Sequence, residues 1–187
     1  MRDLACADDV VSRGRPSVLQ RLAAGDLSAL EDVYDRHAAP LYRLALSILG
    51  SEADAEDVVQ DVLLGLMRRR GARIRDLRLY LLASARHRAI SLLRRRRREV
   101  LDGQSQSTLF EASVHDPVEA VRAREIGELL LGLPPEQREV IVLKVYDEMT
   151  FAEIARVVKA RPNTVASRYR YAVEKLRRFL GGCRDDK

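Results

Sequence analysis

The sequence predicts an all-α protein that consists of two small helical domains joined by a flexible linker. Almost every periodic segment repeats its apolar residues at helical spacing, and Gly or Pro residues separate these segments rather than bounding alternating strands. Between them, residues 99–117 (EVLDGQSQSTLFEASVHDP) are polar and lack regular apolar spacing. We therefore expect an N-terminal extension at 1–16, helical domains at 17–98 and 118–180, a linker at 99–117 and a tail at 181–187.

Composition limits the classes of protein that fit. The chain has 187 residues, of which 47% are hydrophobic and 33% charged, as is ordinary for a helical protein, and its net charge of +5 favours an anionic partner. No apolar run reaches membrane-spanning length, and acids stand where a signal peptide needs a basic start, so we expect a cytoplasmic protein. Cys6 and Cys183 lack metal-ligand spacing. We expect free thiols, no metal and no cofactor.

Four helices are expected in the first domain. The first covers residues 17–24 and stops at Gly25, and the second covers 26–49 with a kink at Pro40 and an end at Gly50. A third follows the Ser51 cap, and a fourth runs from about Asp76 through an arginine run. Helical spacing predicts that the second and third helices bury Leu30, Val33, Tyr34, Leu41, Leu44, Ala45, Ile48, Val58, Val59, Val62, Leu63, Leu66 and Met67.

The third helix opens with acids. Glu52, Asp54 and Glu56 have a structural explanation, because negative charge near a helix start interacts favourably with the macrodipole. Asp57, Gln60 and Asp61, at spacing i, i+3 and i+4, share a face away from the apolar residues. Such a compact polar face suits docking of a partner's helix.

The fourth helix carries the opposite charge. Arg86, His87 and Arg88 precede five successive arginines at residues 94–98. Arginines at a helix end are often solvated and stabilised by the dipole, but five exceed that need, and a phosphate backbone is a natural counter-charge. His87 has no ligand partner at metal-binding spacing, so we expect a packing or contact role.

The second domain ends in two short helices around a tight corner. A helix at 118–131 is interrupted at 133–135 and continues over 136–146. Thr150 and Glu153 form the pattern of a capping box, so a helix should begin near Phe151, and Asn163 offers a second cap before a helix from about Thr164. The pair reads as a DNA-binding helix-turn-helix, although a plain amphipathic hairpin with a solvated basic face has the same pattern.

Three segments together resemble regions two and four of an extracytoplasmic-function sigma factor of bacterial RNA polymerase. They are ALEDVYDRHAAPLYRLALSILGSEADAEDVVQDVLLGLMRR, RLYLLASARHRAISLLRRRRR and LPPEQREVIVLKVYDEMTFAEIARVVKARPNTVASRYRYAVEKLRR. The phrase DAEDVVQDV ahead of an Arg-rich helix discriminates more than the helix-turn-helix, which many regulators share. The resemblance implies a non-catalytic subunit that directs promoter recognition, strand opening and transcription initiation.

The resemblance also implies partners and site residues. Asp57, Gln60 and Asp61 match the motif that docks on the clamp helices of the polymerase's largest subunit, and region four is expected to meet the flap of the second-largest subunit. The segment that holds unpaired minus-ten bases corresponds here to Tyr80, Arg86, His87, Arg88, Ser91, Arg94 and Arg95. The minus-thirty-five duplex would meet Asn163, Thr164, Ala166, Ser167, Arg168, Arg170, Tyr171 and Lys175, with Arg168 and Arg170 as the first choices for base contacts. An anti-sigma factor that holds the two domains together is a common form of control in the family.

Several positions depart from the family pattern. Tyr80 stands where Trp is frequent, and His87 where Asn is frequent, so the minus-ten pocket should differ. In the second domain Asn163 replaces a common Gly and Ala166 a frequent Lys or Arg, so base contacts must be redistributed. Lys159 stands at the usual corner glycine, which costs about 1 kcal/mol if its backbone is left-handed.

Two rival classes stay open at this point. A conventional repressor or activator explains the helix-turn-helix and predicts tight binding to operator duplex by the protein alone, but it leaves Asp57, Gln60 and Asp61 unexplained. An enzyme acting on nucleic acid explains the basic surface but needs a metal cluster, an activated nucleophile or a phosphate-cradling loop, and the sequence suggests none of these.

Overall fold

The computed structural model describes residues 17–69, 74–101, 127 and 129–182. Within these ranges the chain is helical and has no strand, which confirms the expected all-α class. The predicted extension, most of the linker, residues 118–126 and both cysteines lie outside the described residues. The predicted domain boundaries therefore stay predictions.

The N-terminal domain consists of four helices, α1 (Val18–Ala23), α2 (Leu27–Leu49), α3 (Glu52–Arg68) and α4 (Leu77–Leu101). The expected caps are present: the Ser51 hydroxyl accepts from the Asp54 amide, and the Asp76 carboxylate accepts from the Leu79 amide. Gly50 ends α2 in the left-handed conformation, with φ of 68°. The helix α2 continues through Pro40 without a break.

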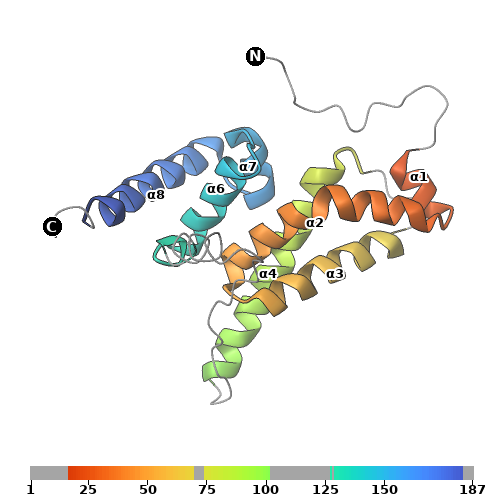
Figure 1. The fold of residues 1–187 in the computed structure, drawn as a ribbon, viewed down its shortest axis with the longest axis horizontal. Helices are drawn as coiled ribbons and strands as arrows, with labels where there is room; N and C mark the ends of the chain where they lie inside the picture. Colours follow the sequence, from red (N-terminus) through yellow and green to blue (C-terminus); the bar gives the residue numbers. More distant parts are fainter. Residues whose placement is uncertain (1–16, 70–73, 102–126, 128, 183–187) are drawn as a thin grey trace, which may run out of the picture.

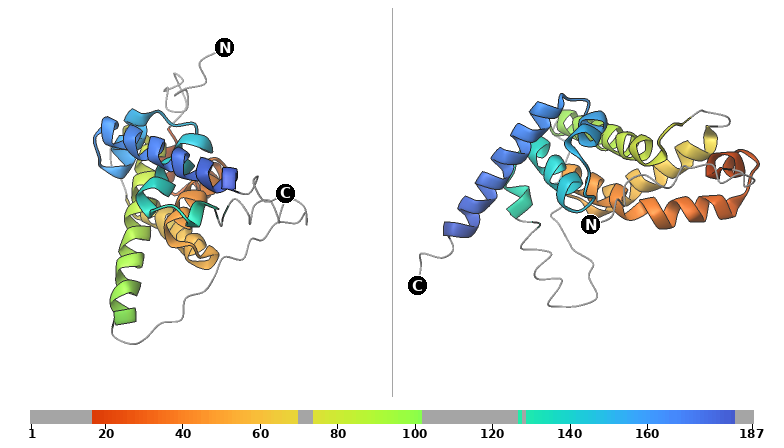
Figure 2. Two further views of the ribbon diagram at one scale, coloured as in Figure 1. Left: turned by 90° about the vertical axis from the view of Figure 1, so that its left-hand side faces the viewer. Right: turned by 90° about the horizontal axis from the view of Figure 1, so that it is seen from above.

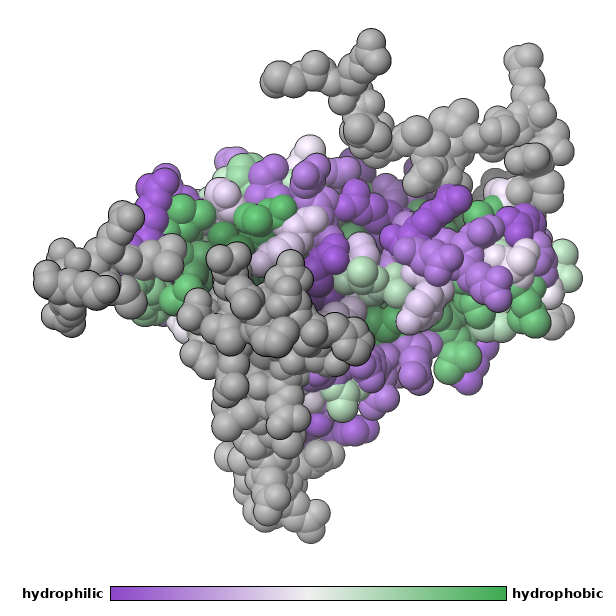
Figure 3. Space-filling model, in the orientation of Figure 1, coloured by the Kyte–Doolittle hydropathy of each residue, from purple (hydrophilic) through white to green (hydrophobic). Residues whose placement is uncertain are grey.

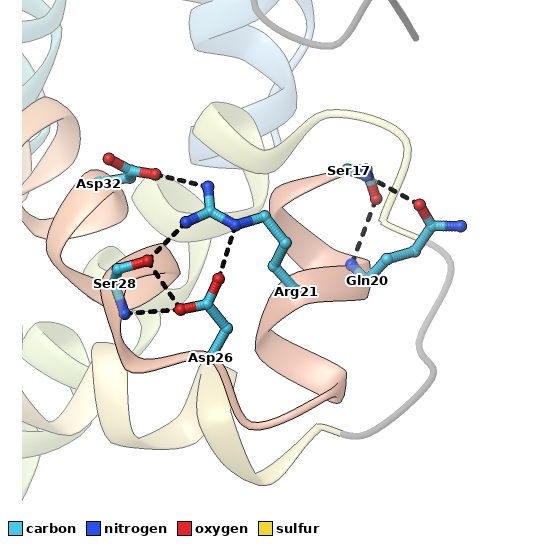
Figure 4. A network of polar contacts seen from close by, with 6 residues as sticks. All are labelled: Ser17, Gln20, Arg21, Asp26, Ser28 and Asp32. Atoms are coloured by element: carbon cyan, nitrogen blue, oxygen red, sulfur yellow. Dashed lines mark hydrogen bonds and ion pairs between the residues drawn. The ribbon is translucent and has the colours of Figure 1, made fainter. Parts of the chain in front are cut away.

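The corner between α1 and α2 is fixed by a polar network (Figure 4). Ser17 and Gln20 form a capping box at the start of α1. The Arg21 guanidinium donates to Asp26, to Asp32 and to the Ser28 hydroxyl, while Asp26 caps α2 through the Ser28 amide. This network turns the chain back so that α1 packs on α2.

Most of the predicted inward residues are buried, with two exceptions. Leu41, Leu44, Val62 and Leu66 are among the buried ones. Tyr34 is 55% exposed and Met67 is 38% exposed, so the prediction that they face inward was wrong. Both lie at the edge of the apolar stripe of their helix, where helical periodicity alone does not decide burial.

The C-terminal domain consists of α6 (Pro135–Val145), α7 (Phe151–Val158) and α8 (Pro162–Gly182). Six consecutive residues of α6, 138–143, are buried, because α6 lies between α2 on one side and α8 on the other. Its start at Pro135 follows the preference of proline for the first helical position. The helix is thus buried all round and shows no single apolar face.

The two domains pack against each other along α2 and α4. In Figures 1 and 2 the C-terminal domain lies beside these helices, with α8 on the outer side and the C-terminal end of α4 projecting from the body. The packing pairs are α2 with α6 and α4 with α7. One continuous apolar cluster joins them, and it includes Leu44 and Leu81 of the N-terminal domain and Leu143 and Ile154 of the C-terminal domain.

Candidate functional site

The acidic face of α3 is open. Asp57, Gln60 and Asp61 are all exposed, and Leu64, one turn further on, is 48% exposed. Asp61 accepts a hydrogen bond from the Arg88 guanidinium of α4 at 2.7 Å, but both side chains are substantially exposed, and such a pair contributes only about 0–1 kcal/mol. The three predicted docking residues therefore share one accessible face.

The earlier acids of α3 behave differently from this face. Asp54 is 7% exposed and forms an ion pair with Arg96 of the arginine run. Its position in the first turn also suits the helix dipole. Asp54 is thus a structural acid, and at least one residue of the arginine run holds α4 against α3.

Next to the acidic face the surface becomes apolar. Hydrophobic side chains gather at the right-hand end of the face shown in Figure 3, over the corner between α1 and α2. The exposed Leu27 of α2 and Met67 of α3 belong to a hollow at this corner that also includes Leu22 and Leu30. An exposed apolar area beside charged residues is typical of protein-interaction surfaces.

The predicted minus-ten residues all lie on α4 but meet different surroundings. His87, Ser91, Arg94 and Arg95 are exposed. Tyr80 is half-buried, with the Arg69 guanidinium 5.5 Å from its ring centroid. Arg86 is different, because it reaches across to the C-terminal domain.

The Arg86 side chain binds the Glu139 carboxylate of α6 in a bidentate pair. Its Nε lies 2.6 Å from Oε2 and its Nη2 lies 3.0 Å from Oε1. Glu139 is 2% exposed. Burial raises the pKa of this carboxyl above its ordinary value, although the hydrogen bonds from Arg86 act in the opposite direction.

The helix-turn-helix forms as predicted, with one correction. Thr150 and Glu153 make the reciprocal capping box, and Lys159 ends α7 in the left-handed conformation with φ of 53°. However, α8 begins at Pro162, so the prediction that Asn163 caps this helix was wrong. Proline at the first helical position needs no amide partner and already has the helical φ, which moves the start ahead of Asn163.

The side chains predicted to meet the upstream duplex divide into an exposed and a half-buried set. Asn163, Thr164, Arg170 and Tyr171 are exposed, with Arg170 stacked 5.4 Å from the Tyr171 ring centroid. Half-buried are Ala166, Ser167, Arg168 and Lys175. Arg168 lies 3.8 Å from the Glu139 carboxylate, and Lys175 donates to the Gly132 carbonyl at 2.8 Å.

Sequence reasoning missed a second group of charges between the domains. Arg43 of α2 pairs with Asp147, which follows α6, at 2.5 Å, and Arg78 of α4 donates to the Asp147 carbonyl. Arg138 of α6 also donates to the Ser47 carbonyl of α2 at 2.8 Å. The only signal in the sequence was the presence of charged residues beside the apolar run of α6, which gives no information on the partner.

Two further searches concern the described part of the chain alone. There, no helix is long and apolar enough to cross a membrane. Among the same residues, no group of three or more His, Cys, Asp or Glu side chains is placed to hold a metal ion.

Two solved structures show the same fold. The structure of CnrH in complex with the cytosolic domain of CnrY aligns with a TM-score of 0.67 and 23% identity, over 88% of this chain and 96% of that chain. Sigma factor RpoE in complex with anti-sigma factor NepR from Bartonella quintana aligns with a TM-score of 0.69 and 23% identity, over 84% of this chain and 98% of that one.

Sequence comparisons extend this similarity to the family. The family model "Sigma-70 region 2" matches residues 33–99, and "Sigma-70, region 4" matches residues 123–176. The ECF RNA polymerase sigma factor SigL of Mycobacterium tuberculosis (strain H37Rv) is 38% identical over 163 residues, which are 84% of this chain and 92% of that protein. SigK of Mycobacterium sp. (strain KMS) is 27% identical over 88% of this chain and 89% of that protein. The chain therefore belongs to the extracytoplasmic-function sigma factors of the sigma-70 family.

Proposed function

We propose that this chain is a non-catalytic promoter-specificity subunit that works in the cytoplasm by binding core RNA polymerase and two promoter elements. The observation that carries this is the separation of surfaces on one small fold. An exposed acidic face lies on α3, basic residues lie on α4, and a helix-turn-helix lies on α7 and α8. A conventional regulator has no use for the first of these.

The α3 face supplies the polymerase contact. Asp57, Gln60 and Asp61 offer two carboxylates and an amide on one side of a helix, which suits the basic groups of a helical partner. The clamp helices of the largest polymerase subunit are that partner. Leu64 extends the same face with an apolar contact.

The basic helix α4 contacts the opened minus-ten element. The exposed residues His87, Ser91, Arg94 and Arg95 can reach phosphates and unpaired bases of a single strand. The smaller Tyr80 ring, in place of a frequent Trp, lies near the start of this helix. Region four binds the minus-thirty-five duplex through the exposed side chains of α8 and meets the flap of the second-largest subunit.

An anti-sigma partner fits the same picture. The solved structures of CnrH and of RpoE were each determined with such a protein or with the cytosolic domain of CnrY. We propose that this chain has a partner of that class, which binds when the domains are packed together.

Polymerase binding tests the proposal directly. Asp61→Arg and Asp57→Arg should each abolish co-elution with core polymerase on gel filtration, because they place positive charge against a basic surface. Asp57→Arg serves as a second variant, since Asp61→Arg also puts an arginine against Arg88. Asp35→Arg, the same change at an exposed position of α2, is the control and should still co-elute. Unchanged affinity of both α3 variants would refute the docking assignment.

A further inference from the structure

The described charges between the domains are not distributed evenly. The cations Arg43, Arg78 and Arg86 come from the N-terminal domain, and the anions Glu139 and Asp147 come from the C-terminal domain. We call these five residues the clasp. Each side of the clasp thus carries one sign of charge, which is the arrangement of a complementary interface.

Both anions are deeply buried by the packing. Glu139 is 2% exposed and Asp147 is 6% exposed, whereas the arginines that approach them keep more contact with water. A buried carboxylate without its cation is strongly destabilising. The closed arrangement therefore depends on the arginines of the opposite domain.

The clasp holds a group that the proposed function needs for DNA. Arg86 is a minus-ten candidate, yet its guanidinium is engaged by Glu139 through two hydrogen bonds. The same carboxylate lies 3.8 Å from Arg168, a candidate for upstream base contact. One buried side chain thus faces one DNA candidate from each domain.

The acidic face of α3 is outside this interface. The C-terminal domain packs on α2 and α4, and Asp57, Gln60 and Asp61 are exposed while the domains are packed. A polymerase can therefore reach its docking face without opening the clasp first.

We propose that the free chain holds itself closed through the clasp, without a partner protein, and that Arg86 and Arg168 become available to DNA only when the domains separate. The closed state itself is independent of the proposed function. The consequence for DNA rests on it. Docking on polymerase through α3 would then precede, and permit, promoter contact.

Energy transfer between two dyes measures the closed state. We would change Cys6 and Cys183 to Ser and attach the dyes at Ala53→Cys of α3 and Arg177→Cys of α8, which are both exposed. The variant Arg43→Glu/Arg78→Glu places acids against Asp147 and should lose the high-transfer population. The control Arg36→Glu/Arg75→Glu makes the same charge change at exposed positions and should keep it. Equal transfer in both double variants would overturn the clasp.

The unaltered clasp gives a test that does not depend on whether the variant folds. The labelled chain should show high transfer alone and lower transfer when core polymerase is added. Low transfer in the isolated chain would overturn the proposal. Failure of polymerase to bind would count against the proposed function instead, and the measurement on the isolated chain would still decide the clasp.

Binding to DNA measures the consequence of opening. If the open form is about a tenth of the population, full opening raises the apparent affinity about tenfold. We expect this increase for Arg43→Glu/Arg78→Glu over Arg36→Glu/Arg75→Glu on a labelled mixed-sequence duplex at low salt. Equal affinity of the two variants, with transfer lost in the first alone, would overturn the role of the clasp in restricting DNA.

Discussion

Arg168 and Arg170 are near neighbours on α8 but meet different surroundings. Arg168 turns toward the buried Glu139, whereas Arg170 is exposed beside Tyr171. The sequence predicts both as candidates because helical spacing places both outside the apolar stripe. It does not predict the carboxylate of α6 that attracts one of them, since that contact depends on tertiary packing.

The exposed Arg170 should therefore carry sequence discrimination. Arg170→Ala should weaken binding to the upstream promoter duplex by roughly 1–3 kcal/mol relative to a scrambled duplex, if the guanidinium reads a base edge bidentately. Fluorescence anisotropy on the two duplexes measures this difference. Arg177→Ala, at an exposed arginine of α8 outside the candidate set, should affect both duplexes alike. The same uniform loss for Arg170→Ala would reassign it to phosphate contact.

Asp26 should leave a signature in acid. Hydrogen bonds from Ser28 and Arg21 lower the pKa of this carboxyl from 3.8 to about 2. A lowered pKa contributes stability that is present above 3.8 and lost as the pH falls toward about 2. In Asp26→Asn the free energy of unfolding should therefore fall less steeply across this window. Urea unfolding at several pH values measures the slope, with Asp35→Asn as an exposed control; equal slopes for Asp26→Asn and the unaltered chain would contradict this origin.

At the scale of the element, caps and breakers were informative because they act over a few residues. Ser17, Ser51, Asp76 and Thr150 each mark the start of a helix, and Gly50 marks an end. The start of α8 was misplaced because Asn163 and Pro162 both favour a helix start, and the proline comes first. The all-round burial of α6 could not be predicted, since it depends on two neighbours from different parts of the chain.

The corner between α7 and α8 carries a measurable strain. Lys159 has φ of 53°, a conformation that a side chain with Cβ adopts at a cost. Lys159→Gly should therefore raise the free energy of unfolding by about 1 kcal/mol, as measured by urea denaturation. Ala160→Gly, at the next position and without positive φ, should lower it. A loss of stability in Lys159→Gly would show that its side chain matters more than its backbone.

At the scale of the whole molecule, the sequence predicted two domains but not their contact. Arg43 and Asp147 are 104 positions apart, and no local pattern connects them. The apolar face of α2 was predicted correctly, yet it serves both its own domain and α6. Periodicity identifies which residues are buried, but it does not say which element buries them.

The closed arrangement and the open acidic face together suggest an order of events for the whole molecule. Polymerase meets α3 first, because that face is exposed in the packed state. Separation of the domains then frees Arg86 from Glu139 and allows α4 and α8 to reach two promoter elements. The two DNA contacts act together because both domains sit on one polymerase.

Run-off transcription with purified core polymerase on genomic fragments tests the central claim most directly. The unaltered chain and Asp35→Arg should initiate at a shared two-part promoter, and Asp61→Arg should give no transcript. Equal transcription with Asp61→Arg would contradict the docking face. A chain that yields no transcript, yet selects duplex fragments without polymerase, would contradict the function as a polymerase subunit.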